Sequence, residues 1–255
     1  MFSRSHFKWL LRSRSLQFTR DRDASRYVPG AVSSFRRRGS SLYYRPGSSD
    51  PEVIYKILLR RGAKAEYYIP EDFNPSLIWD IGGNIGAASI YFSECYPRAE
   101  IHCFEPMPEN HTIIARNIEG RERIRMHPFA LGATEGMLEI RPSDSDRNLG
   151  GFSFHDAGTA KTQGQKVRVR TPRMVIEDGT AQAPDLIKID VEGAEYDILT
   201  AFDPRVLERV GWITGELHSN RSFALLEFLS QWFDVEVKKT LGKRLFNFLA
   251  KNRKI

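Results

Sequence analysis

Two short sequences near the middle of the chain carry residues suited to binding a nucleoside. IWDIGGNIG, residues 78–86, is an apolar run interrupted by Asp80 and closed by a glycine-rich turn, which is the pattern of a buried strand that leads into a helix. IHCFEP, residues 101–106, places the carboxylate of Glu105 nineteen residues after Gly86. An acid about 20 residues beyond such a turn is at the spacing at which a carboxylate binds ribose hydroxyls. The two sequences therefore predict a nucleoside-binding βαβ unit.

The turn after the first of these strands narrows the choice of nucleoside. A dinucleotide site usually reads G-x-G-x-x-G and leaves bare backbone amides for a pyrophosphate. Here the spacing is Asp80-x-Gly82-x-Asn84-x-Gly86, which places an acid beside the turn. A carboxylate suits a cationic ligand, and S-adenosylmethionine carries a sulfonium, an ammonium group and a ribose but no phosphate. The residues therefore favour S-adenosylmethionine, with NAD and an ordinary structural strand–turn–helix as the alternatives.

Strands and helices alternate along the rest of the chain. Strands are expected to end at Asp80, Glu105, Asp190 and His218, a third strand with its exit turn is expected at 124–132, and two more strands at 234–240 and 244–252. Helices are expected at 51–61 with Asp50 as N-cap, at 87–96 with Asn84 as cap, and at 110–118 and 222–233. Alternating segments around a polar loop at 142–165 predict a hairpin-like insertion over 137–171. This order predicts an α/β fold with a mostly parallel sheet, helices on both faces and an antiparallel C-terminal edge strand.

Polar residues gather at the predicted carboxyl ends of these strands, which is where ligands bind in a parallel sheet. The segments are Asp80 to Gly86, Glu105 to Pro106, Phe129 to Ala130, Asp190 to Glu195 and Glu216 to His218. A single acid at a strand end is usually a helix cap. Acids at four ends of one sheet indicate a binding site, because clustered carboxylates repel one another unless a cation or a proton compensates. His218 follows Glu216 by two residues and fits a surface histidine as well as a catalytic one.

The positive charge of the chain is concentrated at its start. Residues 1–50 contain 11 Lys and Arg against three acids, a net charge of +8, so the remaining chain carries −2 of the total of +6. The first twenty residues contain no acid and mix basic residues with Phe7, Trp9, Leu10 and Leu11. A solvated, partly helical extension, a patch for an anionic membrane or an acidic partner, and an organellar transit segment all fit this composition. Because basic and aromatic residues do not interleave in the remainder, no nucleic-acid partner is expected.

Composition and cysteine count agree with one medium-sized domain. The chain of 255 residues is 41% hydrophobic, which is enough for a single α/β core with an extension. Its two cysteines, Cys95 and Cys103, form neither a disulfide framework nor a zinc pattern and are expected to be buried. No apolar run approaches the roughly 18 residues that span a bilayer, which together with the cysteines predicts a cytoplasmic protein. We expect a flexible basic extension over 1–40, a helical lead-in over 41–75 and an S-adenosylmethionine-binding domain over 76–255.

Four of these motifs together resemble one protein family. IWDIGGNIGAASIYFS, IHCFEPMPENHTIIARNI, FALGATEG and LIKIDVEGAEYDIL are similar to the FkbM family of S-adenosylmethionine-dependent methyltransferases, from about Tyr44 to the C-terminal strands. The resemblance implies a seven-stranded, Rossmann-like class I methyltransferase fold. It also implies O-methylation of a hydroxyl on a sugar, polysaccharide, glycolipid or polyketide-type acceptor. Gly83 stands where the family more often has alanine, a change expected to be harmless, and RMVIED at 173–178 departs from the family pattern.

The resemblance also implies roles for individual residues. Asp80, Gly82, Asn84 and Gly86 would line the methionine end of the cofactor, Glu105 would bind the ribose, and Phe129 and Ala130 would flank the adenine. Methyl transfer to an alcohol needs an aligned oxygen and benefits from a general base, for which Asp190, Glu192 and His218 are the candidates. A divalent metal held by Asp190 and neighbouring acids is the alternative, since it would lower the pKa of the hydroxyl. No complete set of metal ligands is evident, so a mechanism without a metal is expected. An NAD-dependent oxidoreductase and a non-catalytic nucleoside-binding protein are the alternative functions.

Overall fold

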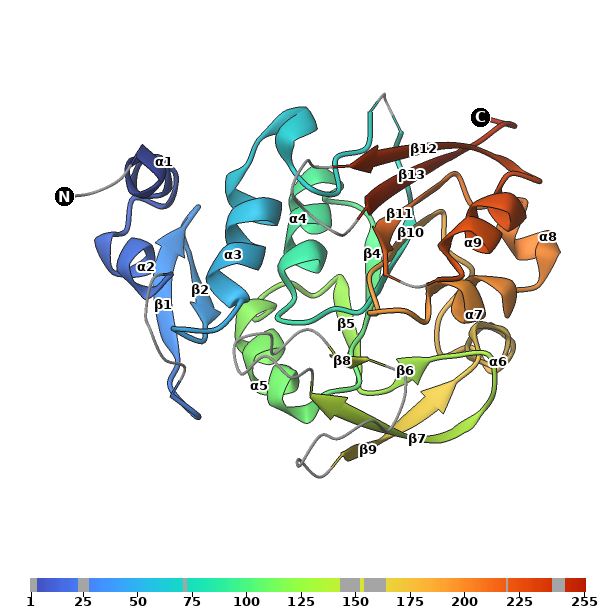
Figure 1. The fold of residues 1–255 in the computed structure, drawn as a ribbon, viewed down its shortest axis with the longest axis horizontal. Coiled ribbons are helices and arrows are strands. Elements are labelled where there is room, and N and C mark those ends of the chain that lie inside the picture. The colour runs from blue at the N-terminus through green and yellow to red at the C-terminus, as the bar shows by residue number, and fades with distance from the viewer. Residues whose placement is uncertain are drawn as a thin grey trace.

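A seven-stranded β-sheet runs through the centre of the molecule, with helices on both of its sides (Figure 1). The computed structural model describes residues 4–22, 28–70, 73–142, 152–153, 164–218, 220–239 and 246–255. The strand order is β12-β13-β11-β10-β3-β4-β5. The strands are β3 (Leu77–Ile81), β4 (Glu100–Phe104), β5 (Ile124–His127), β10 (Leu186–Ile189), β11 (Trp212–Leu217), β12 (Phe233–Lys239) and β13 (Phe246–Asn252). Neighbouring strands are parallel except at β13, which is antiparallel to both β11 and β12.

This sheet confirms the predicted α/β fold with a mostly parallel sheet. The C-terminal hairpin is present, but its antiparallel strand is not at the edge, because β13 enters between β11 and β12 and leaves β12 outermost. The predicted third strand is β5, and its exit turn leads into a short strand, Ala130–Leu131, of a separate sheet. Cys103 lies buried in β4 as expected. Cys95 is exposed, because it is the last residue of its helix and lies beyond the packed face.

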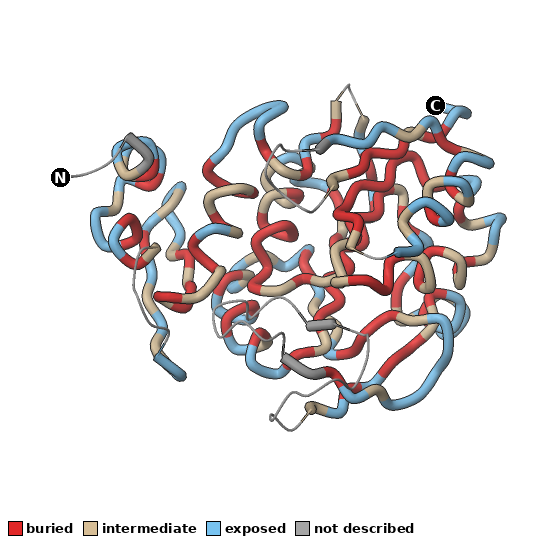
Figure 2. The backbone as a smooth tube through the Cα atoms, in the orientation of Figure 1, coloured by how far each residue is buried: buried red, intermediate tan, exposed pale blue. Residues whose placement is uncertain are grey.

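Alternate residues of the central strands supply the two halves of the core. In β3, Ile78 belongs to a cluster with helices α3, α4 and α5, whereas Trp79 belongs to a second cluster with α7, α8 and α9. These helices are α3 (Asp50–Ile54), α4 (Ala87–Cys95), α5 (Pro108–Asn117), α7 (Glu195–Thr200), α8 (Pro204–Leu207) and α9 (Ser222–Leu229). Buried residues follow the sheet and the helices that face it (Figure 2). Within the described ranges, none of the helices has the length and apolar character of a membrane span.

The helix predicted at 51–61 is present but begins differently. α3 passes directly into a π-helical turn, Tyr55–Leu59. Ser49 precedes the first turn, and the Asp50 carboxylate does not cap the helix but accepts hydrogen bonds from the guanidinium of Arg45 at 2.8 and 2.9 Å. Both of these side chains are buried, so the ion pair fixes the position at which α3 starts.

A four-stranded sheet of order β6-β9-β7-β8 follows β5 along the chain. Its strands are β6 (Ala130–Leu131), β7 (Gly136–Pro142), β8 (Phe152–Ser153) and β9 (Gln165–Arg170), and helix α6 (Pro172–Glu177) comes next. β7 and β9 pair in antiparallel fashion, as a hairpin-like insertion requires. Most of the polar loop predicted at 142–165 lies outside the described residues.

The N-terminal residues pack on the lead-in through aromatic rings. Helices α1 (Arg4–Ser13) and α2 (Leu16–Asp21) precede a two-stranded sheet of β1 (Ser33–Arg37) and β2 (Ser40–Tyr44). The Trp9 ring stacks on Tyr55 with centroids 4.2 Å apart, and the buried Phe18 ring lies 4.3 Å from Phe35. Residues expected to form a flexible extension thus contribute side chains to the core cluster that contains Ile78.

Phe18→Leu is expected to lower the free energy of unfolding by about 2 kcal/mol. The substitution removes roughly three buried carbons at about 0.8 kcal/mol each and leaves space between the neighbouring rings. Chemical denaturation followed by circular dichroism measures this difference. Phe7→Leu lies on the same segment, but Phe7 is 61% exposed, so this control should change stability by less than about 0.5 kcal/mol. Equal stability of the two variants would show that α2 does not belong to the cooperative core.

Candidate functional site

The carboxyl ends of β3, β4, β10 and β11 meet at a pocket of about 250 Å³. Its lining includes Gly82, Gly83 and Asn84 after β3, Glu105, Pro106 and Met107 after β4, Asp190, Val191 and Glu192 after β10, and Glu216 of β11. Further lining residues are Glu52, Val53 and Lys56 of the lead-in and Ala130, Leu131 and Ile140 of the smaller sheet. All five segments that the sequence places at strand ends therefore contribute to one cavity.

Two glycines allow the turn after β3 to approach its neighbours closely. Gly82 has a φ of +81°, and a Cβ atom there would lie 2.0 Å from the carbonyl oxygen of Asp190. A Cβ atom on Gly83 would lie 2.2 Å from the sulfur of Cys103. Alanine in place of Gly83, expected to be a harmless exchange, therefore does not fit in this chain unless the cysteine moves. The turn after β3 is thus packed directly on the turn after β10.

Asn84 and Glu192 border the pocket in backbone conformations that non-glycine residues seldom adopt. Their φ angles are +50° and +55°, and such residues cluster at ligand sites. The predicted role of Asn84 as a helix cap is wrong, because α4 begins only after Gly86, which has the left-handed conformation itself. The Asn84 Oδ1 atom is buried and has no hydrogen-bond partner among the described residues, which leaves an acceptor at the pocket.

Asp80 lies behind this turn and not in the pocket. Its fully buried carboxylate accepts a hydrogen bond from the Ser89 hydroxyl at 2.6 Å and lies 3.1 Å from Nζ of Lys188 on the neighbouring strand. The same Nζ donates to the carbonyl oxygen of Gly82 at 2.6 Å. The expectation that Asp80 lines the methionine end of the cofactor disagrees with this placement, because Lys188 already balances its charge. Lys188 itself was not predicted, although a lysine within the apolar run LIKI is a signal.

Glu105 stands just beyond the end of β4 and connects the two turns beside it. Its Oε2 accepts a hydrogen bond from the Asn84 amide at 2.7 Å, and its Oε1 accepts one from the Met107 amide at 2.9 Å. Burial raises the pKa of Glu105, and these amide donors partly offset the rise. The Asn110 side chain also forms a hydrogen bond with Glu105, so the carboxylate, with about four lone-pair sites, keeps one for a ribose hydroxyl.

Apolar residues form another part of the pocket lining. They are Phe104, Met107, Ala130, Leu131 and Ile140. Ala130 is where an adenine contact is predicted, whereas Phe129 packs against Phe104 and His127 and is not part of the lining. Gly86 is also outside the lining and faces the side chains of α5. Met107 and Ile140 were not predicted, because Met107 has no polar function and Ile140 belongs to the insertion.

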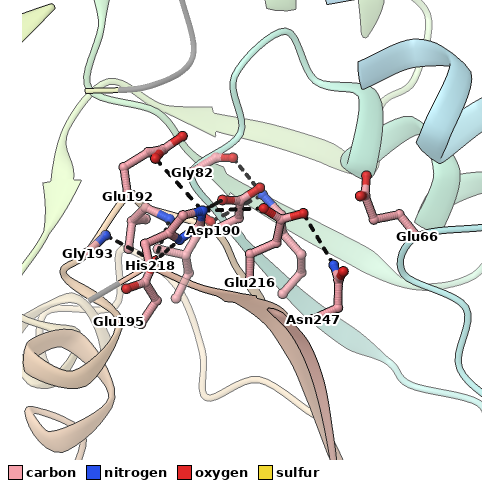
Figure 3. Close-up of polar contacts among 12 residues, drawn as sticks. Glu66, Gly82, Asp190, Glu192, Gly193, Glu195, Glu216, His218 and Asn247 are labelled. Carbon is pink, nitrogen blue, oxygen red and sulfur yellow. Dashed lines mark hydrogen bonds and ion pairs between the residues drawn. The ribbon is translucent and has the colours of Figure 1, made fainter. Parts of the chain in front are cut away.

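Acidic side chains surround His218 at the ends of β10 and β11 (Figure 3). Its Nε2 lies 3.3 Å from Glu216, 3.6 Å from Asp190 and 3.8 Å from Glu192. Its Nδ1 lies 2.8 Å from Glu195. The structure therefore brings the three predicted catalytic candidates together and adds Glu195 and Glu216 as their neighbours.

These acids oppose the expected role of His218 as a general base. Burial alone would lower the pKa of His218, but the neighbouring carboxylates of Glu195, Glu216 and Asp190 raise that pKa to about 11. A histidine with this pKa carries a proton at neutral pH and cannot accept another. Burial raises the pKa of Glu192 to about 7, so Glu192 is better suited to take a proton.

Three further polar residues of this region were not predicted. The Tyr67 hydroxyl donates a hydrogen bond to Asp190 at 2.9 Å, and Lys56 Nζ lies 3.6 Å from Glu66. Burial raises the pKa of Glu66 to about 7, against the charge of Lys56. The EYY sequence around Glu66 follows no motif, so only the tertiary structure brings this segment to the pocket.

In its sequence, the chain is similar to known methyltransferases. The family model for the methyltransferase FkbM domain matches residues 80–248. Methyltransferase 1 of Beauveria bassiana is 28% identical over 65% of this chain and 75% of its own. The hexuronic acid methyltransferase AglP of Haloferax volcanii is 26% identical over 66% of this chain and 67% of its own. The 2-O-methyltransferase NoeI of Sinorhizobium fredii is 30% identical over 48% of this chain and 56% of its own.

A solved structure shares the fold. The methyltransferase FkbM from Methylobacillus flagellatus KT superimposes with a TM-score of 0.53 at 17% identity. The match covers 79% of this chain and 50% of the other, so this chain spans about half the length of that protein. At this level of identity the likeness supports the class I methyltransferase fold.

Proposed function

Because the chain belongs to the FkbM methyltransferase family and is an enzyme of that class, we propose that it transfers a methyl group from S-adenosylmethionine to a hydroxyl of a sugar-type acceptor. One observation carries the proposal: a single pocket holds Glu105, bonded to both flanking turns, together with the carboxylates of Asp190, Glu192 and Glu216. The names of two relatives refer to a hexuronic acid and to 2-O-methylation. They support a sugar hydroxyl within the wider choice of polysaccharide, glycolipid and polyketide-type acceptors.

The pocket residues fit S-adenosylmethionine in their chemistry. Glu105 has a lone pair left for a ribose hydroxyl, and Ala130 and Ile140 offer apolar surface to an adenine. The unpartnered Oδ1 of Asn84 can accept a hydrogen bond from an ammonium group. NAD fits less well, because the Asn84 amide donates to Glu105 and is not free for a pyrophosphate.

S-adenosylmethionine supplies an electrophilic methyl group on a positively charged sulfur. The pocket has to hold the acceptor oxygen in line with this group, and positioning of this kind can supply roughly 7–11 kcal/mol of the barrier. Asp190 and Glu192 line the pocket, and one of these two carboxylates accepts the proton of the hydroxyl. Proton removal by a positioned base typically contributes about 10²–10⁴-fold to the rate.

Isotope transfer onto an acceptor panel tests the function. The enzyme is incubated with labelled S-adenosylmethionine and fractions of cell-extract glycans and lipids, and the products are analysed by mass spectrometry. We expect a mass increase of one methyl group on a carbohydrate-containing fraction. Label on nucleic acid alone, or transfer to no fraction, would contradict the proposal.

Glu105→Ala is expected to weaken the binding of S-adenosylhomocysteine by about 10- to 150-fold. The loss corresponds to charge-assisted hydrogen bonds to the ribose, worth roughly 1.5–3 kcal/mol. Calorimetry on the unmodified protein should show an affinity on the order of micromolar for this ligand and no comparable affinity for NAD. Glu109→Ala, at an exposed position in the first turn of α5, is the control. Binding of NAD without S-adenosylhomocysteine would overturn the cofactor assignment.

We also propose that helix α1 contacts anionic membranes. Phe7 and Leu11 are each 61% exposed and lie four residues apart, hence on one face, next to the exposed Lys8. Exposed apolar and basic side chains together favour the surface of an acidic bilayer. In vesicle sedimentation, Phe7→Ser with Leu11→Ser is expected to lower the affinity for phosphatidylserine vesicles at least about tenfold. Val237→Ser, on β12, is the control, and equal binding of all variants would contradict the proposal.

A further inference from the structure

Three side chains beside the pocket converge in the way that metal ligands do. Asp190, Glu192 and His218 each offer one ligand atom, and these atoms all lie within 4.8 Å of one another. His218 Nε2 is 3.6 Å from Oδ1 of Asp190 and 3.8 Å from Oε2 of Glu192. Ligand atoms about 2.1 Å from one ion are roughly 3.0–3.5 Å apart at angles of 90–109°. The two distances measured from His218 Nε2 are slightly longer than this. A small inward movement of these side chains would therefore bring the three ligand atoms to bonding distance from one ion.

His218 is oriented as a metal-binding histidine would be. Its Nδ1 lies 2.8 Å from Oε1 of Glu195, whose side chain is 2% exposed. A carboxylate behind one ring nitrogen fixes the ring and turns the other nitrogen toward a metal, as is common in metal sites. The His218 side chain is 6% exposed, and its Nε2 has no hydrogen-bond partner among the described residues. Nε2 is aimed at the two carboxylates, and a cation bound there would displace the proton of Nε2 and bridge the three residues.

The charges around the pocket also favour a bound cation. Six acids line it, namely Glu52, Glu66, Glu105, Asp190, Glu192 and Glu216. The two lysines in its lining are engaged, since Lys188 pairs with Asp80 at 3.1 Å and Lys56 lies 3.6 Å from Glu66. Carboxylates held this close destabilise one another unless a cation compensates. A divalent cation that takes the place of the His218 proton would offset that repulsion with two positive charges in place of one.

We propose that Asp190, Glu192 and His218 bind one divalent cation, and that this cation holds the hydroxyl of the methyl acceptor. The second part rests on the proposed function, whereas the binding of the cation does not. The proposal replaces the expectation of a site without a metal. A ligand set is not evident in the sequence, because the histidine follows β11 while the acids follow β10, and only the parallel pairing of these strands brings the three together.

The ligand chemistry narrows the choice of cation. Two carboxylate oxygens suit Mg²⁺ and Mn²⁺, and an imidazole nitrogen suits Zn²⁺ and other transition ions, so Mn²⁺ is a probe that accepts both. Each carboxylate would use one oxygen for the cation. The other oxygen of Glu192 would accept the hydroxyl proton, since the other oxygen of Asp190 accepts a hydrogen bond from Tyr67. A cation at this place lowers the pKa of a bound hydroxyl and fixes its direction. Glu195 touches neither cation nor acceptor and acts as a positioning residue for His218.

Binding of Mn²⁺ to the chelator-treated protein tests the cation site without any acceptor. Electron paramagnetic resonance of free Mn²⁺ is expected to show one saturable site per chain. His218→Ala and Glu192→Gln are expected to weaken this site at least about tenfold, and Glu195→Gln about 10- to 100-fold. Glu177→Gln, in which the replaced side chain of α6 is 57% exposed, is the matched control and should bind like the unmodified protein.

The affinity for S-adenosylhomocysteine serves as the check on folding for each variant. If His218→Ala does not fold, Glu192→Gln decides, because the Glu192 side chain is 32% exposed and tolerates replacement more readily. Absence of saturable Mn²⁺ binding, or equal binding in these variants and the control, overturns the proposal. Mn²⁺ binding without methyl transfer to any acceptor supports the cation site and contradicts the proposed function. Methyl transfer that chelation leaves unchanged overturns the role of the cation toward the acceptor.

Discussion

Glu192→Gln is expected to lower the turnover number at least about 10²-fold while the affinity for S-adenosylhomocysteine stays within a few-fold. Glutamine keeps the size of the side chain but can neither take a proton nor offer a charged oxygen to a cation. Glu192 lines the pocket but lies outside the two turns that Glu105 connects, so contacts to the cofactor remain. Turnover at saturating methyl donor and calorimetric affinity report on these two effects separately.

Glu177→Gln is again the control, because it removes one exposed acid on α6 by the same chemical change. If Glu192→Gln turned over normally on the true acceptor, Asp190 alone would be the base that takes the hydroxyl proton. The pH profile by itself would not settle the assignment between Glu192 and His218. Burial raises the pKa of Glu192 to about 7, the range usually attributed to a histidine, whereas the pKa of His218 is raised to about 11. Substitution is therefore the decisive measurement.

The unit of β3, α4 and β4 that leads to Glu105 could be predicted because its parts are neighbours in sequence. The strand, the glycine turn, the helix and Glu105 all lie between residues 78 and 105, so local patterns carry the information. The meeting of the strand ends followed from a general property of parallel sheets. The contacts of Asp80 could not be predicted in the same way. Its partner Lys188 belongs to β10, and only the register between β10 and β3 places the two residues opposite each other.

The raised pKa of His218 could not be predicted from the sequence either. The sequence shows Glu216 nearby, but Asp190, Glu192 and Glu195 come from the preceding strand and helix, and their number around the ring decides its pKa. The N-terminal residues differ from the expected flexible extension for a related reason. Basic side chains obscure the apolar pattern there, and Phe18 becomes buried only because the hairpin of β1 and β2 supplies aromatic partners. Contacts between distant segments thus account for both differences from the expectations.

Lys188→Met is expected to lower the free energy of unfolding by about 3–5 kcal/mol, the usual cost of leaving one charge of a buried pair uncompensated. The side chains of Lys188 and Asp80 are 3% and 0% exposed and lie 3.1 Å apart. Without the lysine, the only other side chain shown to bond the carboxylate within the described residues is that of Ser89. Methionine has a similar length and is apolar, so little packing is lost with the charge. Urea denaturation measures the change.

Adding Asp80→Asn to Lys188→Met separates charge from geometry. Asparagine is neutral, so the double variant is expected to recover more than half of the lost stability, and the difference from additivity gives the coupling between the two residues. No recovery would mean that the cost comes from the hydrogen bond of Lys188 to the Gly82 carbonyl oxygen, which is 2.6 Å long. In that case the turn itself loses its support, and because Gly82 lines the pocket, the affinity for S-adenosylhomocysteine should fall in the single and the double variant alike.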